Sequence, residues 1–117
     1  IYVRSASKDH GLGNQIEGYF EEGQKVVVIE DLISTGGSSL KAVEALRAAN
    51  VNVMGMLAIF TYQFSVSVDA FAKANCKVDT LTNYTALIEL ATEKNYITPA
   101  QMESLKEWRN HPDTWGK

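Results

Sequence analysis

Apolar residues along the chain fall into runs and stripes that predict alternating strands and helices. The run Val26–Ile29 is uninterrupted and β-branched, and a second apolar run spans Val53–Phe60. Such runs are typical of strands covered on both faces, as in a parallel sheet. The segment between them, Ser39–Asn50, carries apolar residues every three positions, which makes one apolar stripe on a helix. A helix of this length between two strands is what a parallel βαβ crossover requires.

The flanking segments extend this alternation. Ile1–Arg4 alternates apolar and polar positions as a strand does, and the polar segment Ser5–Gly18, with three glycines, is predicted to be a loop. Further along we expect a helix over 65–74, a short strand over 77–82, a helix over 84–95 and a last helix capped by Thr98. The predicted fold is α/β, with a mainly parallel sheet flanked by helices, in a single domain spanning 1–117. Because the chain starts at Ile1 within an apparent strand, we expect this domain to lack an N-terminal portion.

Composition excludes several classes of protein. The 117 residues are 45% hydrophobic, which suits a globular domain. A net charge of −3 argues against nucleic acid as a partner, because binders of the phosphate backbone need a basic face. No apolar run reaches the length of a membrane span, so no membrane partner is expected. The single cysteine, Cys76, is predicted to be a small buried residue, and its isolation fits a reducing, cytoplasmic location.

The stretch VVVIEDLISTGGSSL, residues 26–40, contains candidate ligand-binding residues. Glu30 and Asp31 follow an apolar strand, and ligands of parallel sheets bind at the carboxyl ends of strands. The run Ser34–Ser39 then combines two glycines with four hydroxyls at the expected start of a helix, which is a favourable place for a phosphate. All four hydroxyls, that of Ser39 included, are predicted donors to that phosphate. The run has neither the lysine of a P-loop nor the spacing G-x-G-x-x-G, so neither nucleotide signature applies.

Two carboxylates beside a phosphate would repel it unless hydroxyls or a cation lay between them. Ribose hydroxyls or a hydrated Mg²⁺ would meet that need. The pattern therefore indicates a phosphorylated sugar, with Glu30 and Asp31 at its hydroxyls and the small-residue loop at its phosphate. The alternative is a helix-capping loop next to a solvated acidic pair.

From Val26 to Ser38 this stretch resembles the phosphoribosyl-pyrophosphate signature of type I phosphoribosyltransferases, with Glu30 where many members carry Asp. The resemblance implies their fold and their donor site. Carried over residue by residue, that site comprises Glu30, Asp31, Leu32, Ile33, Ser34, Thr35, Gly36, Gly37 and Ser38. It also implies that Mg²⁺ is bound mostly through the donor itself, so that no protein residue is a dedicated metal ligand.

A second motif, RSASKDHGLG over Arg4–Gly13, resembles the mobile catalytic loop of orotate phosphoribosyltransferases. The resemblance implies transfer of a 5-phosphoribosyl group from phosphoribosyl pyrophosphate to orotate, in a homodimer whose loop reaches the neighbouring subunit. It makes Lys8, His10 and Asp31 the catalytic residues and adds Arg4, Lys8 and His10 to the donor site. Cationic side chains there would neutralise charge that develops on the leaving pyrophosphate.

Two departures from the family pattern concern substrate recognition. Ser5 follows Arg4 where many members have a second basic residue, and Thr61-Tyr62 stands where many have an Asp–Arg pair. Ser34 is then a candidate contact for orotate. Three alternatives stay open: a phosphoribosyltransferase for a purine or uracil, a non-catalytic regulator that senses the donor, and an inert fragment of the enzyme.

Overall fold

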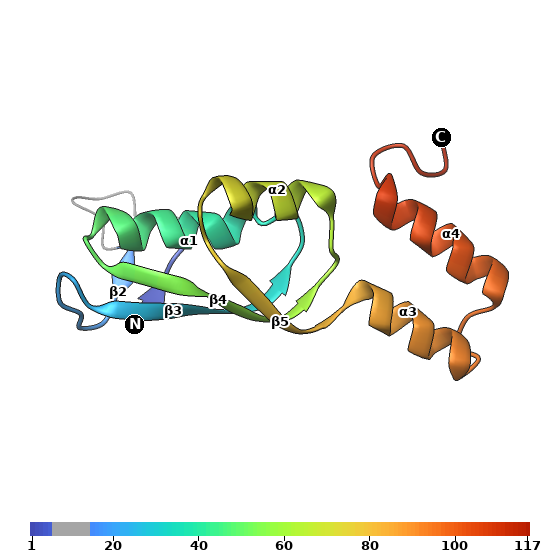
Figure 1. Ribbon diagram of the computed structural model, residues 1–117, viewed down its shortest axis with the longest axis horizontal. Coiled ribbons are helices and arrows are strands. Elements are labelled where there is room, and N and C mark those ends of the chain that lie inside the picture. Colours follow the sequence, from blue (N-terminus) through green and yellow to red (C-terminus); the bar gives the residue numbers. More distant parts are fainter. Residues whose placement is uncertain (6–14) are drawn as a thin grey trace.

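The computed structural model describes residues 1–5 and 15–117 of the chain. Strands and helices alternate through these ranges (Figure 1), and most bounds differ from the predicted ones by one or two residues. The elements are β1 (Tyr2–Val3), β2 (Ile16–Glu17), β3 (Lys25–Ile33), α1 (Gly37–Ala48), β4 (Asn52–Thr61), α2 (Ser65–Lys73), β5 (Val78–Asn83), α3 (Tyr84–Glu93) and α4 (Pro99–Asn110). No helix in the described ranges is both long and apolar enough to cross a membrane.

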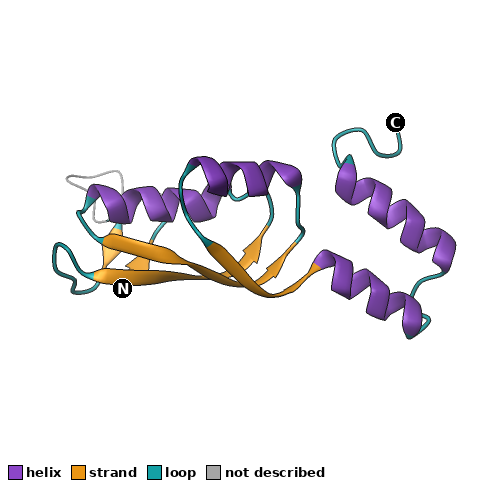
Figure 2. Ribbon diagram, in the orientation of Figure 1, coloured by secondary structure: helices purple, strands orange, loops and turns teal. Residues whose placement is uncertain are grey.

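The main sheet is parallel, as predicted, with the strand order β3-β4-β5. Helices α1 and α2 both lie on one of its faces (Figure 2). Ile33 at the end of β3 is opposite Thr61 of β4, which is in turn opposite Asn83 of β5. The carboxyl ends of the three strands therefore meet at one edge of the sheet, and the segments that follow them start side by side.

The predicted loop over Ser5–Gly18 is wrong at its C-terminal end. Ile16 and Glu17 form strand β2, which pairs antiparallel with β1 in a separate two-stranded sheet. The Arg4 N–H donates to the Gln15 carbonyl at 2.7 Å and extends this pairing by one step. Two-residue strands are held by backbone hydrogen bonds, so they leave no apolar periodicity for sequence analysis to find.

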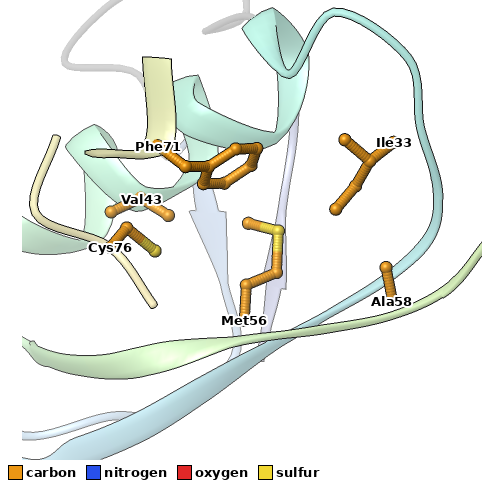
Figure 3. Close-up of a cluster of buried hydrophobic side chains, with 6 residues drawn as sticks. All are labelled: Ile33, Val43, Met56, Ala58, Phe71 and Cys76. Carbon is orange, nitrogen blue, oxygen red and sulfur yellow. The ribbon is translucent and has the colours of Figure 1, made fainter. Parts of the chain in front are cut away.

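The hydrophobic core lies between the sheet and helices α1 and α2. Six buried side chains from β3, α1, β4, α2 and the segment before β5 form it (Figure 3): Ile33, Val43, Met56, Ala58, Phe71 and Cys76. Val43 of α1 is 0% exposed, the lowest exposure among these six side chains. Cys76 is buried as predicted, and burial raises the pKa of its thiol.

The opposite face of the sheet stays exposed in the described structure. Ile29 of β3 is 72% exposed, Ile59 of β4 is 55% exposed and Leu81 of β5 is 73% exposed. The prediction that the apolar strands are covered on both faces is therefore wrong for this structure. The reason is topological, because α1 and α2 pack on the same face (Figure 1) and α3 and α4 extend away from the sheet.

Helices α3 and α4 form a pair joined to the sheet by an aromatic cluster. The ring of Trp108 on α4 lies 5.4 Å from those of Tyr84 and Phe64 and 5.8 Å from that of Tyr62, centroid to centroid. At the start of α4, Thr98 and the residue three positions later exchange hydrogen bonds in the predicted capping box. The last helix is thus anchored at both ends, and Tyr62 has a packing role.

Replacing Val43 with Ala is expected to lower the free energy of unfolding by about 2 kcal/mol, because two buried methyl groups are lost and a cavity remains. Val66→Ala is the control, since Val66 on α2 is 55% exposed and should change stability by less than about 0.5 kcal/mol. Urea denaturation of both variants measures the difference. Equal losses would contradict the burial of Val43 in the core.

Candidate functional site

The predicted signature occupies the carboxyl end of β3, a short loop and the first turn of α1. Glu30 and Asp31 lie within β3, near its C-terminal end, and residues 34–36 connect the strand to the helix. This is the edge where the three parallel strands end (Figure 1). The structure therefore brings the acidic pair and the small-residue loop together in the way the sequence predicted.

The loop between β3 and α1 requires a glycine at position 36. It is the N-cap of α1 and has a φ of 88°, in the left-handed region that favours glycine. A Cβ atom there would lie 2.9 Å from Cε2 of Phe71, which is too close for any side chain. Backbone conformation and packing both require glycine at this position.

The first turn of α1 is suited to an anion. The helix begins at Gly37 with no side-chain cap and no acidic residue in its first turn, whereas α3 and α4 are both capped by a side chain. Its first backbone N–H groups carry the partial positive charge of a helix N-terminus. Ser34, Thr35 and Ser38 are exposed beside them and add hydroxyl donors. The arrangement suits a phosphate group.

Glu30 is held toward the helix. Its Oε2 accepts a hydrogen bond from Ser39 Oγ at 2.9 Å, and its Oε1 accepts one from the backbone N–H of Asp31 at 3.1 Å. Ser39 is only 1% exposed. The prediction that the Ser39 hydroxyl donates to a phosphate is therefore wrong in this structure, because that hydroxyl is buried against a carboxylate.

Asp31 is exposed and ionised. Its pKa is lowered, first by hydrogen bonding with the neighbouring Glu30 carboxyl and then by the backbone N–H of Leu32, which donates to Oδ1 at 2.7 Å. A group whose pKa is lowered from an ordinary value of 3.8 stays a carboxylate at neutral pH. Asp31 is thus a ready acceptor for hydroxyl groups of a ligand.

Arg4 is paired with Glu17 in this structure. Its Nε donates to Glu17 Oε1 at 2.6 Å in an ion pair that links β1 to β2. Strand β1 lies beside β3. Val3 of β1 and Glu30 of β3 both line a cavity of about 300 Å³ between β1, β3 and α1. Lys8 and His10, the other predicted cations, lie outside the described residues.

A polar cluster next to the site was not found by sequence analysis. The side-chain oxygen of Gln63, just after β4, accepts hydrogen bonds from Thr85 Oγ1 at 2.6 Å and from Arg109 at 3.4 Å. Arg109 also donates to Thr85 Oγ1 at 3.3 Å. These residues are far apart in sequence, so no local motif could reveal the cluster. It joins α4 to the end of β4, next to Thr61-Tyr62, which stands where many family members have an Asp–Arg pair.

Metal ligands are not gathered in the part of the chain that the structure describes. Among residues 1–5 and 15–117, no group of three or more His, Cys, Asp or Glu side chains is arranged to hold a metal ion. The two carboxylates of the site, those of Glu30 and Asp31, supply the kind of hard oxygen atoms that Mg²⁺ prefers.

Comparison with known proteins gives close relatives but no match to a family model. The chain is 59% identical, over all 117 residues, to the orotate phosphoribosyltransferase of Listeria innocua. It is 52% identical over the same length to that of Cytophaga hutchinsonii. The chain spans 56% of the length of each of these relatives.

Solved structures agree with these relatives. The UMP synthase of Leishmania donovani matches with a TM-score of 0.69 and 28% identity, over 81% of this chain and 21% of that one. The orotate phosphoribosyltransferase of Mycobacterium tuberculosis, in complex with 5-phospho-α-D-ribosyl 1-diphosphate, matches with a TM-score of 0.57 and 25% identity, over 64% and 45%. In sequence and in fold, the chain is thus similar to part of the orotate phosphoribosyltransferases.

Proposed function

We propose that this chain carries the donor-binding part of an orotate phosphoribosyltransferase. The reaction is transfer of the 5-phosphoribosyl group from phosphoribosyl pyrophosphate to orotate, which gives orotidine 5′-phosphate and pyrophosphate. The observation that supports this most is the geometry of residues 30–38, where two carboxylates precede an uncapped helix start reached through Gly36. Identity to named orotate phosphoribosyltransferases along the whole chain supports orotate as the acceptor.

The two ends of the donor's ribose phosphate fit different parts of the site. The 5′-phosphate binds at residues 34–38, where the first backbone N–H groups of α1 and the exposed residues Ser34, Thr35 and Ser38 supply hydrogen-bond donors. The ribose hydroxyls donate to the carboxylates of Glu30 and Asp31. Because Asp31 stays ionised, its charge also stabilises the electron-poor ribose ring as pyrophosphate leaves.

Cations of the N-terminal segment act on the leaving group. Arg4, Lys8 and His10 neutralise the charge that develops on pyrophosphate in the transition state. Arg4 is available for this because its partner Glu17 is exposed, and exposed ion pairs contribute little stability. Pyrophosphate, with its greater negative charge, can replace Glu17 as the partner of Arg4. If the segment Arg4–Gly13 closed over the donor, it would also exclude water that could hydrolyse the donor.

The remaining properties follow from the same proposal. Mg²⁺ would be held mainly through the donor and would supply positive charge against the pyrophosphate, while Glu30 and Asp31 accept from the hydroxyls of the same ligand. The enzyme works in the cytoplasm as a homodimer in which the loop of one subunit serves the neighbouring site. Ser34, exposed at the end of β3, contributes to orotate binding.

Asp31→Asn is expected to reduce kcat for orotidine 5′-phosphate formation by about 10²-fold or more in the full-length protein. Asparagine retains an oxygen that accepts the Leu32 N–H, so the variant removes charge while keeping the local hydrogen bond. Asp79→Asn on β5 is the control, since Asp79 is an exposed carboxylate on another strand. Steady-state rates with orotate, uracil and hypoxanthine measure both the effect and the base preference. A near-normal rate for Asp31→Asn would refute the ribose role of this residue.

Lys8→Ala should lower kcat without lowering the temperature of unfolding, because its role is electrostatic and confined to the transition state. Lys77→Ala, which removes an exposed lysine before β5, provides a comparison of equal charge change. Turnover and thermal melts of both variants are the measurements. If the two variants have the same kcat, Lys8 has no part in the reaction.

Gly36→Ala is expected to weaken binding of ribose 5-phosphate at least tenfold, about 1.4 kcal/mol, because the added methyl group collides with the Phe71 ring and moves the loop. Gly23→Ala is a matched control: Gly23 also has a positive φ, 78°, but a Cβ there meets no atom within 4 Å. Both variants should lose stability from backbone strain. Calorimetric titration separates them, and equal affinities would contradict the phosphate role of the loop.

A further inference from the structure

Ser39 and Glu30 link the two elements that form the proposed donor site. Ser39 is the third residue of α1 and Glu30 is near the end of β3. The Ser39 hydroxyl donates to Glu30 Oε2 at 2.9 Å and is 1% exposed. The donor side of this hydrogen bond is shielded from solvent, and Ser39 itself is too deeply buried to contact a ligand.

The hydrogen bond restrains a side chain that is otherwise flexible. A glutamate has several rotatable bonds, and fixing them when a ligand binds costs conformational entropy. In this structure Oε2 of Glu30 accepts from Ser39 and Oε1 accepts from the N–H of Asp31 at 3.1 Å. These two hydrogen bonds restrain the carboxylate, and preorganisation of this kind raises affinity.

We propose that Ser39 is a positioning residue that sets the conformation of Glu30 and, through it, the recognition of ribose hydroxyls. This inference rests on the proposed function, in which Glu30 accepts from those hydroxyls. It assigns to Ser39 a role distinct from that of Ser38, the adjacent exposed residue, which the proposed function places at the phosphate.

The test measures dissociation constants of the full-length protein for three probes: ribose 5-phosphate, 2-deoxyribose 5-phosphate and inorganic phosphate. The ratio of the first two dissociation constants reports recognition of the 2-hydroxyl. The dissociation constant for inorganic phosphate reports whether the phosphate site at residues 34–38 is intact. Ser39→Ala is expected to reduce the preference for ribose 5-phosphate by about fivefold to tenfold, since a hydrogen bond to a charged group is lost. Affinity for inorganic phosphate should not change.

Ser67→Ala is a closely matched control. Ser67 is the third residue of α2, is 3% exposed and donates its hydroxyl hydrogen bond to the Phe64 carbonyl at 2.8 Å. It has the same helical position and burial as Ser39 but its partner is a backbone oxygen. Ser67→Ala should destabilise the protein to a similar extent and leave the preference for ribose 5-phosphate unchanged.

Glu30→Ala completes a double-mutant cycle. If Ser39 acts through Glu30, Ser39→Ala has no further effect on the preference in the Glu30→Ala background. If Glu30→Ala lowers the preference but Ser39→Ala does not, or if Ser39→Ala weakens all three probes equally, the positioning role is overturned and the proposed function stands. If the unaltered protein does not distinguish the two sugars, the ribose role of Glu30 in the proposed function fails, and the inference with it.

Discussion

The absence of a side chain at Gly36 allows the site to rest directly on the hydrophobic core. A Cβ at this position would come within 2.9 Å of the Phe71 ring, and Phe71 belongs to the same buried cluster as Val43 and Met56. The loop is thus positioned by three elements at once: the strand before it, the helix after it and the ring of α2 beneath it. Close packing transmits such constraints rigidly, which suits a loop that must present backbone N–H groups to a ligand.

The hydrogen bonds of Glu30 and the start of α1 explain how two carboxylates can lie beside a phosphate site. Like charges at short range repel, so Glu30 and Asp31 would weaken phosphate binding if their carboxylates faced the loop without partners. Glu30 instead accepts from Ser39 and from the Asp31 N–H, which spreads its charge over two donors. The N-terminus of α1 adds partial positive charge and carries no acidic residue in its first turn.

Sequence patterns predicted this region well because its physical causes are local. An apolar β-branched run forms β3, a run of small residues marks the loop before α1, and the capping box at Thr98 likewise requires only residues three apart. Features that depend on distant partners were not predictable. Strand β2 forms by backbone pairing with β1. Ile29 is exposed because α1 and α2, the helices that connect the parallel strands, both pack on the other face of the sheet. An apolar run indicates that a strand favours burial but does not say what covers it.

The residues from Ser34 to Ser39 have two different roles, which differ in burial and not in composition. From Ser34 to Ser39 the residues are small throughout, yet Gly36 and Ser39 are buried and the four others are exposed. Ile33, just before them, is also buried, so every third residue from Ile33 faces the protein interior. The exposed pairs between these positions can contact a ligand, while the buried residues fix the backbone against the core. Composition alone made Ser38 and Ser39 equivalent hydroxyl donors. The rotation of the helix between adjacent residues leaves Ser38 exposed and turns the Ser39 hydroxyl toward Glu30.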